Sequence, residues 1–166
     1  MFSRLLLLFS FCALLSSCVK SSSDTPGCTY TASTVVVPAS ELTNLQTWVA
    51  ANRPAATFNS GGGFYYDIPA VGTGTVIPDV CKSVTVKYIG YLTNGIKFTS
   101  TNEETIPSTF VLGGLITGWQ RGLPLIKAGG SINLYLPPTL GYGANAAGTI
   151  PANSILIFNI QLTAVQ

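Results

Sequence analysis

The chain has 166 residues, of which 47% are hydrophobic and only 8% are charged, with a net charge of +2. This length suits one main domain with a modest extension, and the near balance of charge excludes a basic stripe for binding nucleic acid. Histidine is absent from the sequence, which excludes Ser-His and Cys-His nucleophile systems and histidine-based metal sites.

The first 17 residues have the pattern of an export signal, with a basic start followed by the apolar run Leu5–Leu15. The following Leu15-Ser16-Ser17-Cys18 resembles the bacterial lipobox, after which the cysteine becomes the lipid-modified first residue. We therefore expect a lipid anchor at Cys18, a flexible tether over residues 18–27 and a place in the cell envelope. Since no Asp follows Cys18, the outer membrane facing the periplasm is favoured. The alternative is a secreted protein with an incidental cysteine.

Residues 28–80 are expected to form an N-terminal extension with one helix. Apolar side chains recur at helical spacing after Ser40, an expected N-cap, until Pro54 ends the pattern. The helix is thus predicted over about residues 40–52. It either folds back on its own domain or joins two copies of the chain, so the protein is predicted to be a monomer or a dimer.

Three shorter patterns flank that helix. The β-branched run 34–37 predicts a short strand, the three glycines at 61–63 predict a hinge, and the run 64–68 predicts a second strand.

Two cysteines, Cys28 and Cys81, are left once the signal is removed and Cys18 is lipidated. In an oxidising compartment these two thiols either pair or remain as two unpaired buried cysteines. On the chain-entropy model, a disulfide closing a loop of this length stabilises the fold by about 4 kcal/mol.

From residue 84 onward the pattern is typical of an antiparallel sheet. Hydrophobic and polar residues alternate in three runs, and Asn94-Gly95 is a tight-turn signal that starts a return strand. The three runs are 84–92, 132–136 and 156–162. We predict an α+β fold in which an antiparallel sheet wraps around one short helix.

The stretch 110–122 joins a short strand, through Gly113-Gly114, to a helix that begins near Gly118 and ends before Pro124. Trp119 would lie in the first turn of that helix. A large flat ring there, preceded by a bend that exposes backbone N–H groups, can floor an apolar pocket with an aimed donor. The alternative is a tryptophan that is simply part of the core.

The second half of the chain carries a dense series of motifs. They are Val86-Lys87-Tyr88-Ile89-Gly90-Tyr91-Leu92, Asn94-Gly95, Phe110-Val111-Leu112-Gly113, Ile116-Thr117-Gly118-Trp119, Leu136-Pro137, Gly141-Tyr142-Gly143, Ile150-Pro151 and Leu156-Ile157-Phe158. Their order and spacing resemble the FKBP family of peptidyl-prolyl cis/trans isomerases. The resemblance implies an FKBP-like domain over residues 81–166 that needs no cofactor and no metal.

The resemblance also implies an apolar pocket in which a proline ring lies on a tryptophan. Its catalytic residues would be Tyr88, Phe98, Trp119, Tyr142 and Phe158. Its substrate-binding residues would be Thr99, Leu115, Ile116 and Ile150. The Ile116 N–H and the Tyr142 hydroxyl would donate hydrogen bonds to the bound chain, and the loop 141–150 would form a flap. Tyr88 and Phe158 could instead be mainly structural.

Two positions depart from the family's usual pattern. Thr99 stands where an Asp most often follows the pocket phenylalanine, and Ser108 stands where the family has a further pocket aromatic. The missing carboxylate is expected to weaken catalysis or inhibitor binding without removing the apolar floor.

The sequence therefore predicts a peptidyl-prolyl isomerase that assists the folding of exported proteins. The alternatives are a chaperone or adaptor of the same fold that grips proline-containing segments with little turnover, and a structural lipoprotein whose pocket is merely core. Expected partners are proline-containing segments of exported proteins and macrolide-type inhibitors. The membrane is expected to be contacted through the lipid anchor only, and nucleic acid is not an expected partner.

Overall fold

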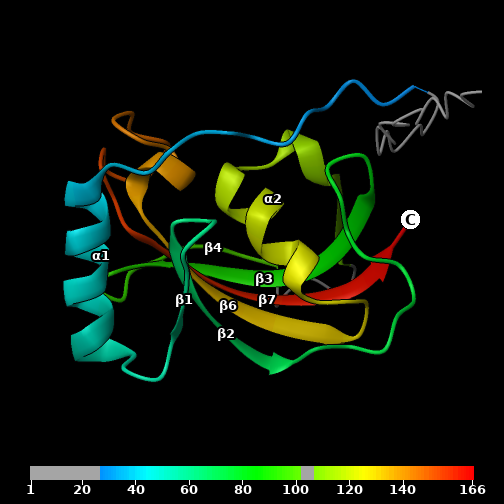
Figure 1. The fold of residues 1–166 in the computed structure, drawn as a ribbon, viewed down its shortest axis with the longest axis horizontal. Coiled ribbons are helices and arrows are strands. Elements are labelled where there is room, and N and C mark those ends of the chain that lie inside the picture. The colour runs from blue at the N-terminus through cyan, green and yellow to red at the C-terminus, as the bar shows by residue number, and fades with distance from the viewer. Residues whose placement is uncertain (1–26, 102–106) are drawn as a thin grey trace, which may run out of the picture.

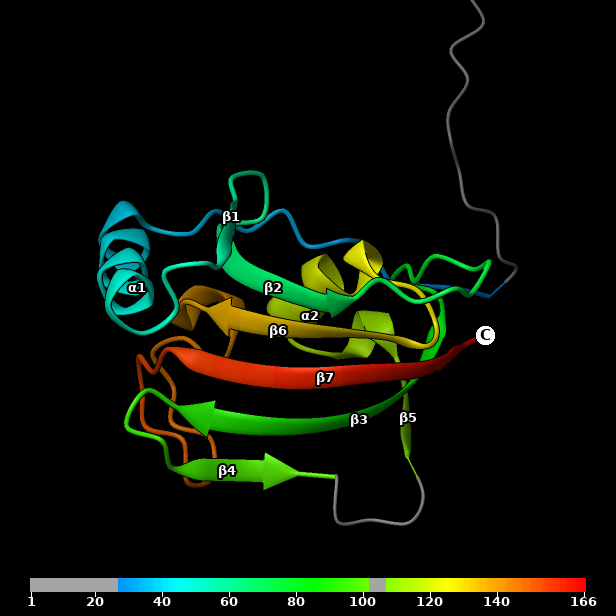
Figure 2. The same ribbon diagram turned by 90° about the horizontal axis from the view of Figure 1, so that it is seen from below.

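The computed structural model describes residues 27–101 and 107–166. The predicted signal, Cys18 and all but the last residue of the predicted tether lie outside the described residues. Within them, seven strands form one sheet in the order β1-β2-β6-β7-β3-β4, with β5 paired to β3. Figure 2 shows these strands side by side. Every pairing is antiparallel. This architecture is the predicted α+β class.

The strands are β1 (Thr57–Asn59), β2 (Phe64–Ala70), β3 (Ser83–Leu92), β4 (Lys97–Ser100), β5 (Ser108–Val111), β6 (Gly130–Leu136) and β7 (Leu156–Val165). The helices are α1 (Ala39–Asn52) and α2 (Thr117–Gly122), with short 3-10 turns η1 (Leu112–Gly114), η2 (Leu123–Leu125) and η3 (Pro138–Leu140).

One face of the sheet packs against α2 and forms the main core (Figure 1). The alternation predicted for the last strand is present, since Leu156, Phe158, Ile160 and Leu162 are all buried in that core. Within α2, an added Cβ at Gly118 would lie 2.3 Å from Leu136, and one at Gly122 would lie 2.6 Å from Leu134. These two glycines therefore let α2 approach β6 closely.

The opposite face of the sheet carries a second, smaller core beneath α1. Leu45 and Val49 of the helix pack with Tyr135 and Ile157 of the sheet, and Trp48 lies 6.0 Å from the Tyr135 ring. Of the two roles predicted for this helix, the structure shows it folded back on its own domain. The helix starts at Ala39, and its N-cap is Pro38 without a side-chain hydrogen bond, so the expectation of a Ser40 cap was wrong.

The segment 28–37 crosses above α2 in Figure 1 without forming a strand, so the strand predicted over residues 34–37 was wrong. The segment does not pair with a strand because its carbonyls bind a side chain instead. The Arg121 guanidinium of α2 donates to the carbonyls of Ser33 at 3.1 Å and Val35 at 2.6 Å. A disulfide joins Cys28, near the start of the segment, to Cys81. We call this segment the strap.

The three glycines predicted as a hinge instead make a tight turn between β1 and β2. Both Gly62 and Gly63 donate their N–H groups to the carbonyl of Asn59, and Gly63 has a φ of 72°. The turn brings β1 and β2 of the predicted extension into the same sheet as the rest of the chain.

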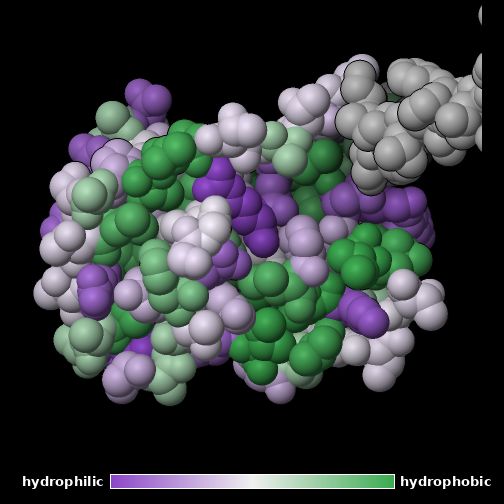
Figure 3. Space-filling view, in the orientation of Figure 1, coloured by the Kyte–Doolittle hydropathy of each residue, from purple (hydrophilic) through white to green (hydrophobic). Residues whose placement is uncertain are grey.

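Hydrophobic and hydrophilic residues are interspersed on the face of the molecule shown in Figure 3. Within residues 27–101 and 107–166, Val36 of the strap is the most exposed large hydrophobic residue, with 84% of its surface accessible. In the described part of the chain, neither helix has both the length and the apolar character that crossing a membrane requires.

Candidate functional site

An apolar cavity of about 270 Å³ lies beside α2. It is lined by Tyr88, Phe98, Thr99, Phe110, Leu115, Ile116, Trp119, Tyr142, Ile150 and Phe158. All nine residues predicted for the pocket are therefore brought to one place, although they come from five separate stretches of the chain. We call this cavity the aromatic pocket.

Trp119 forms the floor of the aromatic pocket from the first turn of α2. It is only 4% exposed, and the rings of Tyr88 and Phe158 meet it edge-on at centroid distances of 4.9 and 5.3 Å. Edge-to-face contacts of this kind add stability beyond the area they bury and hold each ring at a fixed angle. The floor is thus rigid, and it presents carbon surface to a ligand.

Phe98 forms a side wall, and Gly90 on the neighbouring strand β3 makes room for it. A Cβ at Gly90 would lie 2.5 Å from the Phe98 ring and 2.8 Å from the Thr99 methyl group. The Phe98 ring meets Phe158 edge-on at 5.6 Å. A glycine in the middle of a strand is therefore explained by the pocket wall rather than by backbone freedom.

Phe110 is a pocket residue that the sequence analysis did not assign to the site. The centroid of its ring lies 6.4 Å from that of Tyr88 at an interplanar angle of 65°, and it lines the cavity. The available signal was its place in β5, directly before the bend that leads to Trp119. Ser108 lies on the same strand and does not line the cavity.

Two residues that line the aromatic pocket, Ile116 and Tyr142, each carry a hydrogen-bond donor. Ile116 is the N-cap of α2; its carbonyl accepts from Trp119 at 3.0 Å, and its own N–H has no acceptor among the described residues. Tyr142 is 41% exposed, and its hydroxyl likewise has no partner in the described part of the chain. The predicted bend offers fewer donors than expected, since the Gly113 N–H is taken by the carbonyl of Val80 at 2.9 Å.

The aromatic pocket holds no charged side chain among the described residues. Thr99, which stands at the position where the family most often has an Asp, is one of the lining residues. No group of three potential metal ligands occurs within residues 27–101 and 107–166. The chemistry that this lining supports is binding of an apolar ring on Trp119 together with two hydrogen bonds to a peptide backbone.

A larger cavity of about 510 Å³ lies between the strap, the β1–β2 turn and α2. Its lining mixes polar and aliphatic residues and includes no aromatic ring, and the Arg121 guanidinium that lines it already donates to three carbonyls. We therefore place the functional site in the smaller, aromatic pocket.

Comparison with known proteins gives a consistent result. The model of the family described as "FKBP-type peptidyl-prolyl cis-trans isomerase" matches residues 74–163. The chain is 37% identical over 120 residues to FkpA of Aeromonas hydrophila, covering 72% of this chain and 44% of that protein. It is 38% identical over 107 residues to FkpA of Escherichia coli K12, covering 64% and 39% of the two chains.

Solved structures agree with these matches. The crystal structure of FkpA from Escherichia coli superposes with a TM-score of 0.67 at 33% identity, covering 77% of this chain and 58% of the other. A peptidyl-prolyl cis-trans isomerase from Pseudomonas syringae pv. tomato gives a TM-score of 0.65 at 30% identity, covering 80% and 98%.

The fold is an antiparallel sheet around a short helix, and the aromatic pocket is lined by Trp119 together with Ile116 and Tyr142. The chain belongs to the FKBP-type peptidyl-prolyl cis-trans isomerase family. It spans less than half the length of the curated relatives that it matches.

Proposed function

We propose that this protein is a peptidyl-prolyl cis/trans isomerase that binds X-Pro segments in the aromatic pocket. The observation that carries the proposal is the position of Trp119, which floors an apolar cavity beside the unpaired N–H of Ile116. A proline ring is a compact apolar group, and the carbonyls around it are acceptors. The cavity therefore offers a partner to each part of an X-Pro segment.

The reaction makes modest demands on the protein. Rotation about a peptide bond has a barrier of about 18–20 kcal/mol, because resonance gives the C–N bond partial double-bond character. At the perpendicular transition state this resonance is lost and the amide is less polar. A dry aromatic surface thus favours the twisted amide over the planar one, and fixed donors hold it. No nucleophile takes part in this scheme.

An isomerisation assay that uses no protease tests the proposal directly. The substrate is a short peptide with an apolar residue before proline, and the variant is Trp119→Ala. The wild-type chain is expected to accelerate exchange between the isomers, and the variant to lose most of that acceleration because the floor is gone. Trp48→Ala is the matched control, since Trp48 packs on Tyr135, which belongs to the second core. Equal rates for the wild type and Trp119→Ala would refute the proposal.

Thr99 favours a second candidate, a module that grips proline-containing segments with little turnover. Because Thr99 lines the pocket and no carboxylate does so among the described residues, Thr99→Asp separates the two functions. A large gain in isomerisation indicates an active site weakened by Thr99. Peptide binding that depends on Trp119, without acceleration in either form, identifies the binding module.

We propose further that the protein acts on proline-containing segments of exported proteins, in the bacterial envelope, anchored by lipid at Cys18. Support comes from the sequence of the first 18 residues. Incorporation of a labelled fatty acid into the wild type but not into Cys18→Ser is the expected result. Incorporation that survives this substitution would contradict the anchor.

A further inference from the structure

We propose that Gln120 and Tyr30 are positioning residues that together aim the Ile116 N–H at the bound substrate. They do so by holding the bend 112–115, which lies directly before Ile116. This inference rests on the proposed function, because it concerns the donor of the same aromatic pocket. Neither residue lines that pocket, so each acts through the backbone of the bend.

Gln120 acts on the peptide unit that contains the donor. Its Nε2 group donates to the carbonyl of Leu115 at 2.8 Å and to that of Gly113 at 3.1 Å. The Leu115 carbonyl and the Ile116 N–H belong to one planar peptide unit, in which the two groups point in opposite directions. Fixing the carbonyl on Gln120 therefore fixes the direction in which the N–H points. A hydrogen bond to the carbonyl also polarises the unit and strengthens its donor.

The remaining polar atom of Gln120, its Oε1, adds no further bond within the described part of the chain. The Oε1 atom is buried and has no hydrogen-bond partner among residues 27–101 and 107–166. A buried acceptor without a partner costs stability, which offsets part of what the two donated bonds contribute. The two bonds that Gln120 donates both end on carbonyls of the bend, so its effect on the Ile116 peptide unit is direct.

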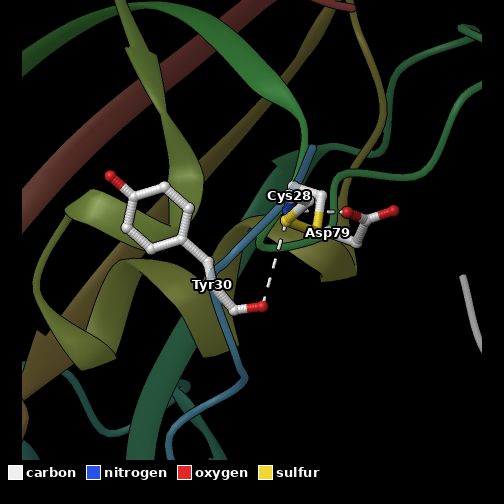
Figure 4. The surroundings of a disulfide bond; sticks show 4 residues. Cys28, Tyr30 and Asp79 are labelled. Atoms are coloured by element: carbon white, nitrogen blue, oxygen red, sulfur yellow. Dashed lines mark hydrogen bonds between the residues drawn. A yellow bond between two sulfur atoms is a disulfide. The ribbon is translucent and has the colours of Figure 1, made fainter. Parts of the chain in front are cut away.

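Tyr30 holds the same bend from the strap. A Cβ at Gly113 would lie 2.4 Å from Cγ of Tyr30, and one at Gly114 would lie 3.4 Å from its hydroxyl oxygen. The ring thus lies along the backbone of both glycines, and Figure 4 shows it against the bend. The two glycines predicted to expose the backbone instead make room for a tyrosine that is distant in sequence.

A disulfide bond holds the strap close to the contact between Tyr30 and the bend. Cys28, two residues before Tyr30, is bonded to Cys81, and the neighbouring Val80 accepts the Gly113 N–H at 2.9 Å. Asp79 accepts the Cys81 N–H at 2.8 Å (Figure 4). The Tyr30 ring is therefore anchored by the same short segment that binds the bend.

The test compares four variants of the full chain in the isomerisation assay. Gln120→Met removes both donated bonds at similar size, and Tyr30→Ala removes the ring. Each is expected to lower kcat about tenfold with less than about a twofold change in KM, because a misaimed donor weakens the transition state more than the ground state. Tyr30→Phe is expected to restore kcat, and Gln46→Met is the control for an exposed glutamine.

A second readout is the amide resonance of Ile116 in an NMR spectrum of the uniformly labelled chain. It is expected to move in Gln120→Met and Tyr30→Ala and to stay in place in Gln46→Met. Unchanged kcat together with an unchanged Ile116 resonance would overturn the inference. If the wild type shows no isomerisation, the proposed function fails; the Ile116 resonance then decides the inference by itself, and an unmoved resonance overturns it.

Discussion

Gly90 is the residue on which the wall of the aromatic pocket depends most directly. In Gly90→Ala the new methyl group would collide with the Phe98 ring and the Thr99 methyl, as the 2.5 and 2.8 Å separations require. The ring cannot bend, so the ring or the backbone around it must shift. We expect proline-peptide affinity to fall about tenfold and the free energy of unfolding to fall by about 1–3 kcal/mol. Peptide titration and chemical denaturation measure the two effects.

Gly61→Ala is the matched control for that substitution. A Cβ at Gly61 has only one neighbour within 4 Å, Asn59 Oδ1 at 3.8 Å. Both quantities should therefore stay near their wild-type values. Equal losses in Gly90→Ala and Gly61→Ala would contradict the role given to Gly90.

Tyr135 links stability to alkaline pH. Its hydroxyl donates to Asp67 Oδ2 at 2.6 Å, and burial, followed by this bond to the carboxylate, raises the pKa of Tyr135 well above its usual value of 10. The folded state therefore keeps the phenolic proton at a pH where the unfolded chain loses it. The contribution is present in full below about pH 10 and is lost as pH rises above that value.

Chemical denaturation at pH 8 and pH 11 checks this sign. The wild type is expected to lose more stability between the two values than Tyr135→Phe, which has no proton to lose at that position. A larger loss in the variant would show that the sign is wrong.

Nine residues of the pocket were predicted from the sequence, because the motifs between Tyr88 and Phe158 resemble those of the FKBP family in order and spacing. The sequence did not predict Gln120 or Tyr30 as residues that act on the bend. The hydrogen bonds of Gln120 depend on its side-chain rotamer, and the contact of Tyr30 depends on the tertiary packing of residue 30 against residues 113–114. Neither feature produces a hydrophobic periodicity that could be recognised in the sequence.

At the level of secondary-structure elements, helix α1 is hydrogen-bonded to η3, which precedes the loop that contains Tyr142. The Glu41 carboxylate accepts from the backbone N–H of Thr139 at 2.8 Å and from its hydroxyl at 2.7 Å. Thr139 lies in η3, three residues before Tyr142. Glu41→Ala is expected to lower the free energy of unfolding by about 1–2 kcal/mol, because hydrogen bonds to a charged group are lost. Denaturation curves measure this change.

Glu41→Gln is the informative companion, since it can still accept the N–H of Thr139. It should retain part of the stability that Glu41→Ala loses. If both variants match the wild type, the contact between α1 and η3 contributes nothing measurable.

The elements show where local patterns were sufficient and where they were not. The strands after residue 84 and the helix near residues 40–52 follow from periodicity, which reports burial of one face. The β-branched run 34–37 was wrongly predicted to be a strand, because the sequence does not reveal that the carbonyls of Ser33 and Val35 accept from Arg121. Tertiary contact overrode propensity there.

For the molecule as a whole, the Cys28–Cys81 disulfide joins the strap to the turn before β3, across a sequence separation of 53 residues. Closing such a loop restricts the unfolded chain and is worth about 4 kcal/mol on the chain-entropy model. The double variant Cys28→Ser/Cys81→Ser is expected to unfold at a lower denaturant concentration. Reduction of the wild type should have the same effect, whereas an unchanged midpoint in both would refute this account.

The aromatic pocket is assembled from residues as distant in the chain as Tyr88 and Phe158, on strands that pair directly. No single stretch of the sequence carries the cavity, so the unfolded chain has no version of it to offer a ligand. A peptide that binds the aromatic pocket therefore stabilises the folded state by mass action. A peptide at one hundred times its dissociation constant would add about 2.7 kcal/mol to the free energy of unfolding. Melting curves recorded with increasing peptide thus measure affinity without any measurement of turnover.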